Sequence, residues 1–262
     1  MTDATAGAAA ATRPAAPARL GPVLDGMLLL GAILAGWQGL HWLAGEVAIA
    51  SPAQATARLG ELFADPDFPG HVWETLAAFL QALAVSLLGG LLIGVAIGGN
   101  RLAAEVAEPM LVALYSLPKI TFYPVILLLF GLGMEAKVAF GAIHGIIPVA
   151  LFTMNGVRNV PAVHLRTAQA LRMTRGQIAA RILVPATIPE IVSGFRIGFA
   201  LTMLGTLIGE LFASQRGLGF LLLKAMERND TPTILALATL LFAFAIAASV
   251  TLLALDKRLH RR

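Results

Sequence analysis

Six long apolar segments dominate the chain, and each is long enough to cross a membrane as a helix. A hydrocarbon core of about 30 Å takes about 20 helical residues. The segments are predicted as helices at residues 24–44, 72–98, 106–130, 136–156, 190–213 and 232–255. The first is longer than the apolar region of a secretory signal, which has about 7–15 residues, so we interpret it as a retained helix. The pattern predicts an all-α membrane protein with six transmembrane helices.

The composition supports this prediction and excludes a soluble domain. Apolar residues make up 58% of the chain and charged residues 13%, with a mean hydropathy of +0.80. Soluble proteins carry about 25% charged residues, which they need to cover their surface. Residues 1–22 are rich in Ala, Pro and Thr without an apolar period, which predicts a disordered cytoplasmic tail. Residues 23–262 are predicted as one transmembrane domain.

The distribution of Lys and Arg predicts the orientation of the chain. With the N-terminus in the cytoplasm, the inner segments hold twelve of these cations and the outer loops hold five. Cytoplasmic loops are enriched in Lys and Arg, so both termini are expected in the cytoplasm. The net charge is +4, but the basic residues lie in loops and form no continuous stripe. We therefore expect contact with the lipid bilayer and not with nucleic acid.

The residue types needed for several kinds of chemistry are missing. The chain has no Cys, its five His are scattered, and it has no G-x-x-x-x-G-K-[ST] phosphate loop. No catalytic residue, metal site or cofactor is therefore predicted.

Glycines at four-residue spacing predict close packing between helices, because lipid provides no hydrophobic drive for helix association. The alternative is that Gly is simply frequent in membrane helices. The spaced glycines are Gly90, Gly94 and Gly98, Gly141 and Gly145, Gly194 and Gly198, and Gly205 and Gly209. Pro118, Pro124 and Pro148 predict bends in the third and fourth helices.

The most polar and basic part of the chain is a loop at residues 157–189. Helix formers dominate 162–172 and 176–183, and Thr174 is a plausible cap for the second of these short helices. Pro185 and Pro189 are interpreted as the point at which the chain re-enters the membrane. Two short helices at the membrane face could press on a soluble partner and pass its movement to the adjoining spans.

This loop resembles the EAA loop of binding-protein-dependent ABC importer permeases. The family pattern is E-A-A, a Gly four residues later, and I-x-L-P nine residues after that. Its positions fall on Arg166, Thr167, Ala168, Arg172, Ile182, Val184 and Pro185. The flanking sequence, with Leu117-Pro118-Lys119 before the loop and Gly217-Leu218-Gly219 after it, is similar to the nitrate/sulfonate/taurine branch. The resemblance covers residues from about 75 to 260.

The resemblance implies a type I ABC importer permease fold in the bacterial inner membrane. It implies a permease that pairs with a second permease subunit, usually an identical copy, and that is not itself an enzyme. A periplasmic solute-binding protein would deliver a small solute, and a cytoplasmic ATPase dimer would grip the loop at residues 163–176. The implied coupling residues are Arg166, Thr167, Ala168, Leu171, Arg172, Met173, Gly176 and Pro185.

Two of the most characteristic positions depart from the family pattern, because Arg166 and Arg172 replace the Glu and the Gly, and Val184 also replaces the Leu. Arg172 brings a bulky charge to a position where the family has a residue that allows tight turning. We expect the partner ATPase to carry a compensating acidic residue or a wider cleft. The alternative is that both arginines are solvated and only contribute to the basic character of the inner face.

Ionisable residues in or near the spans are functional candidates, because charge in hydrocarbon costs about 2.5–3.5 kcal/mol on insertion scales. Lys119, Arg196 and Glu210 are interpreted as candidates for the translocation path. The alternatives are that Lys119 is structural, that Arg196 reaches the lipid interface, and that Glu210 packs against another helix. His144 is expected to be a buried histidine with a hydrogen-bond partner.

Three other functions fit the sequence less well. An ion-coupled secondary transporter should show two related halves, and the chain has no internal repeat. An intramembrane hydrolase would have to rely on Ser116 and His144, which no motif supports. A structural scaffold would explain the small-residue spacing but not the basic loop.

Overall fold

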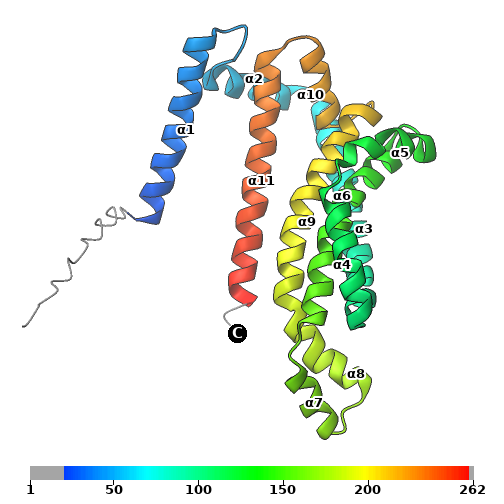
Figure 1. The fold of residues 1–262 in the computed structure, drawn as a ribbon. Helices are drawn as coiled ribbons and strands as arrows, with labels where there is room; N and C mark the ends of the chain where they lie inside the picture. The colour runs from blue at the N-terminus through cyan, green and yellow to red at the C-terminus, as the bar shows by residue number, and fades with distance from the viewer. Residues whose placement is uncertain (1–20, 260–262) are drawn as a thin grey trace, which may run out of the picture. The chain divides into compact units, whose positions relative to one another are not determined.

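The computed structural model describes residues 21–259, and helices joined by short turns make up most of this range (Figure 1). The described residues contain no β-strand. Among these residues, five helices are long and apolar enough to cross a membrane, and a sixth span results if two helices joined at a sharp bend are counted together. The all-α class is therefore confirmed, with one of the six predicted spans broken. The predicted tail lies outside the described residues except for its last two positions.

The helices that belong to the spans extend the predicted segments by a few residues or divide them. They are α1 (Pro22–Ala44), α3 (Phe68–Gly98), α4 (Arg101–Ser116) with α5 (Tyr123–Phe130), α6 (Met134–Arg158), α9 (Val184–Ala213) and α11 (Thr231–Leu259). The other elements are α2 (Pro52–Ala64), the 3-10 turn η1 (Lys119–Phe122), α7 (Ala162–Ala170), α8 (Arg175–Ile178), the π-helical turn η2 (Ala179–Leu183) and α10 (Leu218–Glu227).

The chain divides into two compact units, and the first ends at Pro52. Its described part is α1 and the loop that follows it. Gly45 ends the helix with a φ of 83°. The loop then folds back onto the end of α1, because Trp37 Nε1 donates to the Ala50 carbonyl (2.9 Å) and His41 Nδ1 to the Ile49 carbonyl (2.6 Å).

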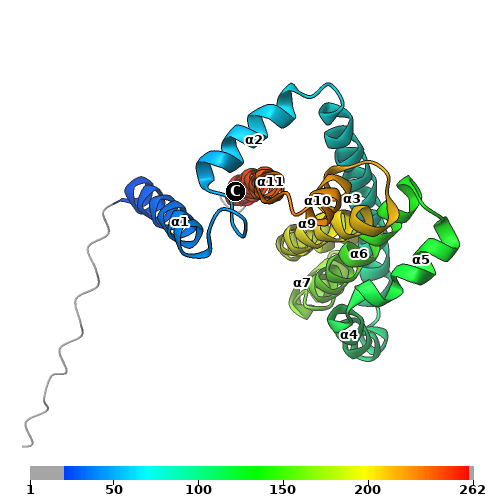
Figure 2. The same ribbon diagram turned by 90° about the horizontal axis from the view of Figure 1, so that it is seen from above.

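The second unit is built around α6, which lies between α3 and α9 (Figure 2). Glycines make this close packing possible. A Cβ atom at Gly94 of α3 would lie 2.5 Å from Cβ of Thr153 on α6, and one at Gly198 of α9 would lie 2.6 Å from Cγ2 of Val149. Any larger residue would push the helices apart. The predicted close packing at spaced glycines is confirmed.

The third predicted span, 106–130, is not one continuous helix. Helix α4 ends at Ser116, and the helical segment from Lys119 to Phe130 leaves it at an angle of 84°. Pro118 lies at the break, where its ring and missing N–H prevent a regular helix. The bend expected at this proline is therefore present, and it is sharp enough to divide the span. Helix α6, in contrast, continues through Pro148.

The fifth span begins earlier than expected. Helix α9 starts at Val184, with Pro185 in its first turn and Pro189 inside it, and the helical run extends back through η2 and α8 to Gly176. The predicted loop at 157–189 therefore ends as regular helix. Both prolines lie within this helical run, so neither marks a helix boundary, and re-entry of the chain into the membrane at these prolines stays a prediction.

Two segments that were predicted as outer loops contain amphipathic helices, α2 and α10. Helix α2 is tied to the beginning of α11 by Arg58, whose Nε donates to the Thr233 hydroxyl (2.8 Å) and whose guanidinium lies 3.9 Å from the Asp230 carboxylate. Helix α10 leads directly into α11 at the same end of the bundle (Figure 1). We call this the α10 end, and the end that carries α7 and α8 the basic end.

Candidate functional site

The segment predicted to couple to a partner projects from the basic end of the bundle (Figure 1). Pro161 precedes α7, and a turn at residues 171–174 joins α7 to α8. Thr174 starts α8 through two reciprocal bonds with Gln177: the Gln177 N–H donates to the Thr174 hydroxyl (3.3 Å), and the Thr174 N–H donates to the Gln177 side-chain oxygen (2.9 Å). The expected cap at Thr174 is confirmed, in the arrangement known as a capping box.

Arg172 adopts a left-handed backbone conformation, with φ of 54°. The Arg172 and Met173 N–H groups close α7 by donating to the carbonyls of Gln169 (2.9 Å) and Ala168 (3.0 Å). Such a helix ending requires a residue with positive φ, and glycine adopts it at least cost. The family pattern places Gly at this position. The residue at this position therefore reverses the chain direction, and Arg172 does so in a backbone conformation that is strained for a non-glycine residue.

The residues predicted to couple differ in how far their side chains are exposed to solvent. Leu171 is 71% exposed, which is unusual for an apolar side chain at an aqueous turn. The side chains of Arg166, Thr167, Arg172, Gly176 and Pro185 are also exposed, and Met173 is half-buried. Ala168 is 1% exposed, so its side chain offers no surface to a partner. In this structure Ala168 packs within the turn, and its predicted contact with a partner stays a prediction.

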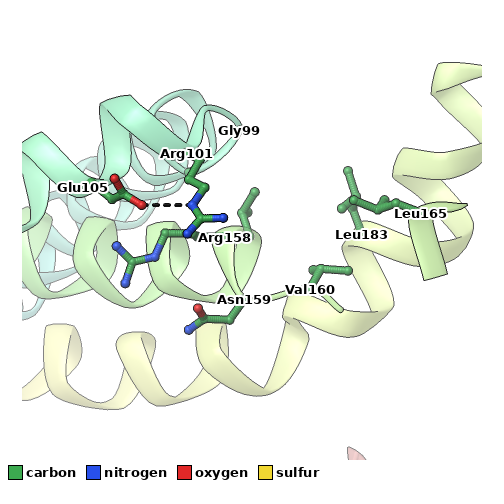
Figure 3. A pocket seen from close by; sticks show the side chains of 10 residues that line it. Gly99, Arg101, Glu105, Arg158, Asn159, Val160, Leu165 and Leu183 are labelled. Atoms are coloured by element: carbon green, nitrogen blue, oxygen red, sulfur yellow. Dashed lines mark hydrogen bonds and ion pairs between the residues drawn. The ribbon is translucent and has the colours of Figure 1, made fainter. Parts of the chain in front are cut away.

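A pocket of about 630 Å³ separates the coupling segment from the turn that joins α3 to α4 (Figure 3). One wall carries Arg101, Glu105 and Arg158. Arg101 pairs with Glu105 (2.9 Å), and Arg158 pairs with Glu108 (2.7 Å), which lies outside the pocket lining. Leu165 of α7 lies on the opposite wall. The coupling segment thus has open space beside it, and its covalent links to α6 and α9 connect it to the centre of the bundle.

A buried polar cluster lies at the α10 end. Glu210 of α9 is 0% exposed and accepts hydrogen bonds from the Thr75 hydroxyl (2.8 Å) and the Gly219 N–H (2.9 Å). Lys137 of α6 is 1% exposed, and its Nζ donates to Glu74 (2.9 Å) and lies 4.0 Å from the second oxygen of Glu210. Because Glu210 is enclosed, the structure favours its packing role over a place on a translocation path.

The same cluster holds the beginning of α10. Three successive N–H groups, which no helix can satisfy internally at its first turn, are bound by side chains of other helices. The Gly217 N–H donates to His71 Nδ1 (3.1 Å), that of Leu218 to the Thr75 hydroxyl (2.8 Å) and that of Gly219 to Glu210. Gly217 has φ of 125°, and a Cβ atom there would collide with the Glu210 carboxylate. Glycine is therefore required at positions 217 and 219, because Glu210 lies too close to the backbone there to leave room for a side chain.

Similarity to known proteins identifies the family to which this chain belongs. Residues 86–262 match the family described as binding-protein-dependent transport system inner membrane component. The chain belongs to this family. It is 30% identical to the riboflavin transport system permease protein of Chloroflexus aurantiacus, over 84% of this chain and 83% of the relative. It is 29% identical to the taurine transport system permease protein of Escherichia coli, over 75% of this chain and 72% of the relative.

The fold is also similar to that of solved importers. A methionine ABC transporter in an inward-facing conformation superposes with a TM-score of 0.59 at 18% identity, over 72% of this chain and 94% of the matched chain. The protein is therefore a permease subunit of an ABC importer, a multi-pass protein of the inner membrane. The matched family and relatives are transport-system permeases, which supports the importer function over that of an ion-coupled secondary transporter.

The two other predicted path residues of the permease lie apart from the polar cluster. Lys119 is 8% exposed at the break of the third span, and its Nζ donates to the Tyr115 carbonyl (3.0 Å). Arg196 of α9 is exposed and lines a pocket of about 450 Å³ together with Tyr115 of α4 and Ser249 of α11. Among the side chains that the structure describes, which exclude those from residue 253 onward, no carboxylate lies within 4.0 Å of either cation.

Lys137 is the permease residue that sequence reasoning missed. The orientation count places Lys137 among the five cations of the outer loops, but helix α6 begins at Met134 and buries it. One signal could have identified it, because a lysine in the first turn of a long apolar helix needs a buried partner if it faces the bundle. Its partner Glu74 lies within the first two turns of α3. His144 fulfils its expectation, with Nδ1 bound to the Phe140 carbonyl (2.7 Å).

Proposed function

We propose that this permease couples to a cytoplasmic ABC ATPase dimer through residues 163–176. Three observations support the proposal: the segment resembles the EAA loop, it projects from the basic end, and its turn exposes Leu171. The exposed residues of the segment would contact the ATPase. Ala168 and Pro185 would instead position them, Ala168 from inside the turn and Pro185 from the first turn of α9.

The connection from this segment to the bundle suggests how ATP-driven movement reaches the solute. The helical run from Gly176 to Phe212 is 37 residues long and joins α8 to α9 with no non-helical break. Closure of the ATPase dimer would tilt the coupling segment, and this run would carry the tilt to the core helices packed on α6. A solute-binding protein would deliver the small solute at the α10 end, which would be periplasmic.

We propose further that two identical copies of the permease form the translocation path. The basic end and both termini would lie in the cytoplasm, in agreement with the excess of Lys and Arg in the inner segments. Lys119 and Arg196 remain the proposed path residues, because both lie in the spans without a carboxylate partner among the described residues. Such cations in a membrane are costly unless a cavity or a ligand compensates them.

A cysteine cross-link tests the proposed coupling directly. The chain has no cysteine, so a single one placed at Met173 reacts without background. We expect it to cross-link to a cysteine in the cleft of the cognate ATPase, whereas a cysteine at Arg228, exposed at the opposite end, does not. In vesicles, uptake should require the ATPase and ATP. Uptake driven by an ion gradient without the ATPase would refute the proposed function.

A further inference from the structure

The coupling segment carries cations without any intervening acid. No Asp or Glu occurs from Ala136 to Pro189, whereas this stretch contains Arg158 and the four arginines of the coupling region, at positions 166, 172, 175 and 181. A loop that only needed to stay soluble would carry both signs of charge, since mixed charges avoid a large single-sign field. The one-sided charge therefore calls for a second explanation beside the membrane topology.

Arg166 and Arg172 have no internal partner that would account for them. Both side chains are exposed, and neither forms an ion pair with any side chain that the structure describes. Arg158, in contrast, is neutralised by Glu108 at 2.7 Å. The chain also keeps Arg172 at φ of 54°, a backbone conformation that is strained for most residues other than glycine. A charge held at a strained turn is best explained by a contact that the turn makes with another molecule.

We propose that the ATPase cleft that receives this turn is lined with carboxylates. The inference rests on the proposed function and adds the chemistry of the partner surface. The turn offers one exposed apolar side chain, Leu171, next to Arg172 in sequence and on the same short segment as Arg166. A matching cleft has an apolar floor for Leu171 and carboxylates around it, which accept from the planar, five-donor guanidinium groups. Complementary charge of this kind sets partner choice and speeds association.

The test uses the full-length permease in lipid nanodiscs and the purified cognate ATPase. Two charge-reversal variants, Arg166→Glu and Arg172→Glu, are compared with Arg228→Glu, an exposed arginine at the opposite end. We expect each reversal at the turn to weaken ATPase binding by about tenfold, and Arg228→Glu to leave it unchanged. Binding of the unmodified permease should also weaken as NaCl rises from about 50 mM to about 500 mM, because salt screens exposed charges.

Arg172→Gly separates the charge from the backbone strain. If charge carries the contact, this variant binds more weakly although its turn is relaxed. If only the turn geometry matters, it binds at least as well as the unmodified protein, and the proposal is overturned. Exchanging one cleft carboxylate of the ATPase for Lys should restore binding to Arg172→Glu, which a misfolded permease could not show.

Leu171→Asp distinguishes failure of this inference from failure of the proposed function. If Leu171→Asp abolishes binding while the two reversals leave it within twofold of the unmodified protein, the turn docks through apolar contact and the acidic cleft is refuted. If Leu171→Asp also has no effect, the ATPase docks elsewhere, and both the inference and the proposed coupling segment fail.

Discussion

Replacing Lys137 by Met should destabilise the permease more than any other single loss of charge described above. The lysine Nζ binds Glu74 at 2.9 Å and the Arg216 carbonyl at 3.0 Å, and it is the cation next to Glu210, at 4.0 Å. Met fills nearly the same volume but leaves the enclosed Glu210 carboxylate with neutral donors only. Removing one member of a buried ion pair costs about 3–5 kcal/mol.

Two further variants test whether the lost stability comes from the unpaired charge of Glu210. Arg101→Met removes one member of an exposed pair, since Arg101 and Glu105 have exposed fractions of 89% and 52%, and should cost less than about 1 kcal/mol. The double variant Lys137→Met with Glu210→Gln should recover part of the stability. Gln keeps an acceptor for Thr75 and Gly219 but carries no charge that needs a partner.

The assay is thermal denaturation of the purified permease in detergent, followed by tryptophan fluorescence and by the fraction that remains monodisperse after heating. We expect the order of stability to be Arg101→Met, then the double variant, then Lys137→Met. Two results would contradict the role argued for the buried pair at the α10 end. Lys137→Met could be as mild as Arg101→Met, or the loss of stability in the double variant could equal the sum of the losses in Lys137→Met alone and Glu210→Gln alone.

Three further outcomes follow from the helix contacts and the coupling turn. Gly94→Ala should cost about 1–3 kcal/mol in the same heat assay, because its Cβ would lie 2.5 Å from Cβ of Thr153, while Gly89→Ala, with its nearest atom at 3.6 Å, should be neutral. Thr174→Ala should cost about 0.5–2 kcal/mol of local stability, seen as faster hydrogen exchange at the start of α8. Arg172→Gly should slow exchange across the same turn, and unchanged or faster exchange would contradict the strain argued for this residue.

The sequence predicts the spans because a helix in lipid must be both long and apolar, and few alternatives satisfy that requirement. It predicts the start of α8 for a similarly local reason, since Thr174 and Gln177 are close enough in sequence to cap one another. The 84° bend is only partly predictable. Pro118 identifies the place, but the angle depends on what the following segment packs against.

Long-range partners explain most of what sequence reasoning missed. Lys137 and Glu74 are 63 residues apart in sequence, and Thr75 and Glu210 are 135 apart, so no local pattern links them. Hydropathy does not identify the α2 and α10 helices because, at 13 and 10 residues, both are too short to span a membrane. Arg172 was recognised as a departure in charge, but its backbone conformation is visible only in the folded chain.

The π-helical turn at Ala179–Leu183 lies between α8, the last helix of the proposed coupling region, and α9. A π turn accommodates one residue more than the α-helix it interrupts, and such turns are frequent at functional sites. Deleting one of its five residues would therefore convert the turn to regular α-helix and leave α8 and α9 in nearly the same phase. The length of the helical run can thus change by one residue at this turn while the direction of the proposed coupling segment is kept.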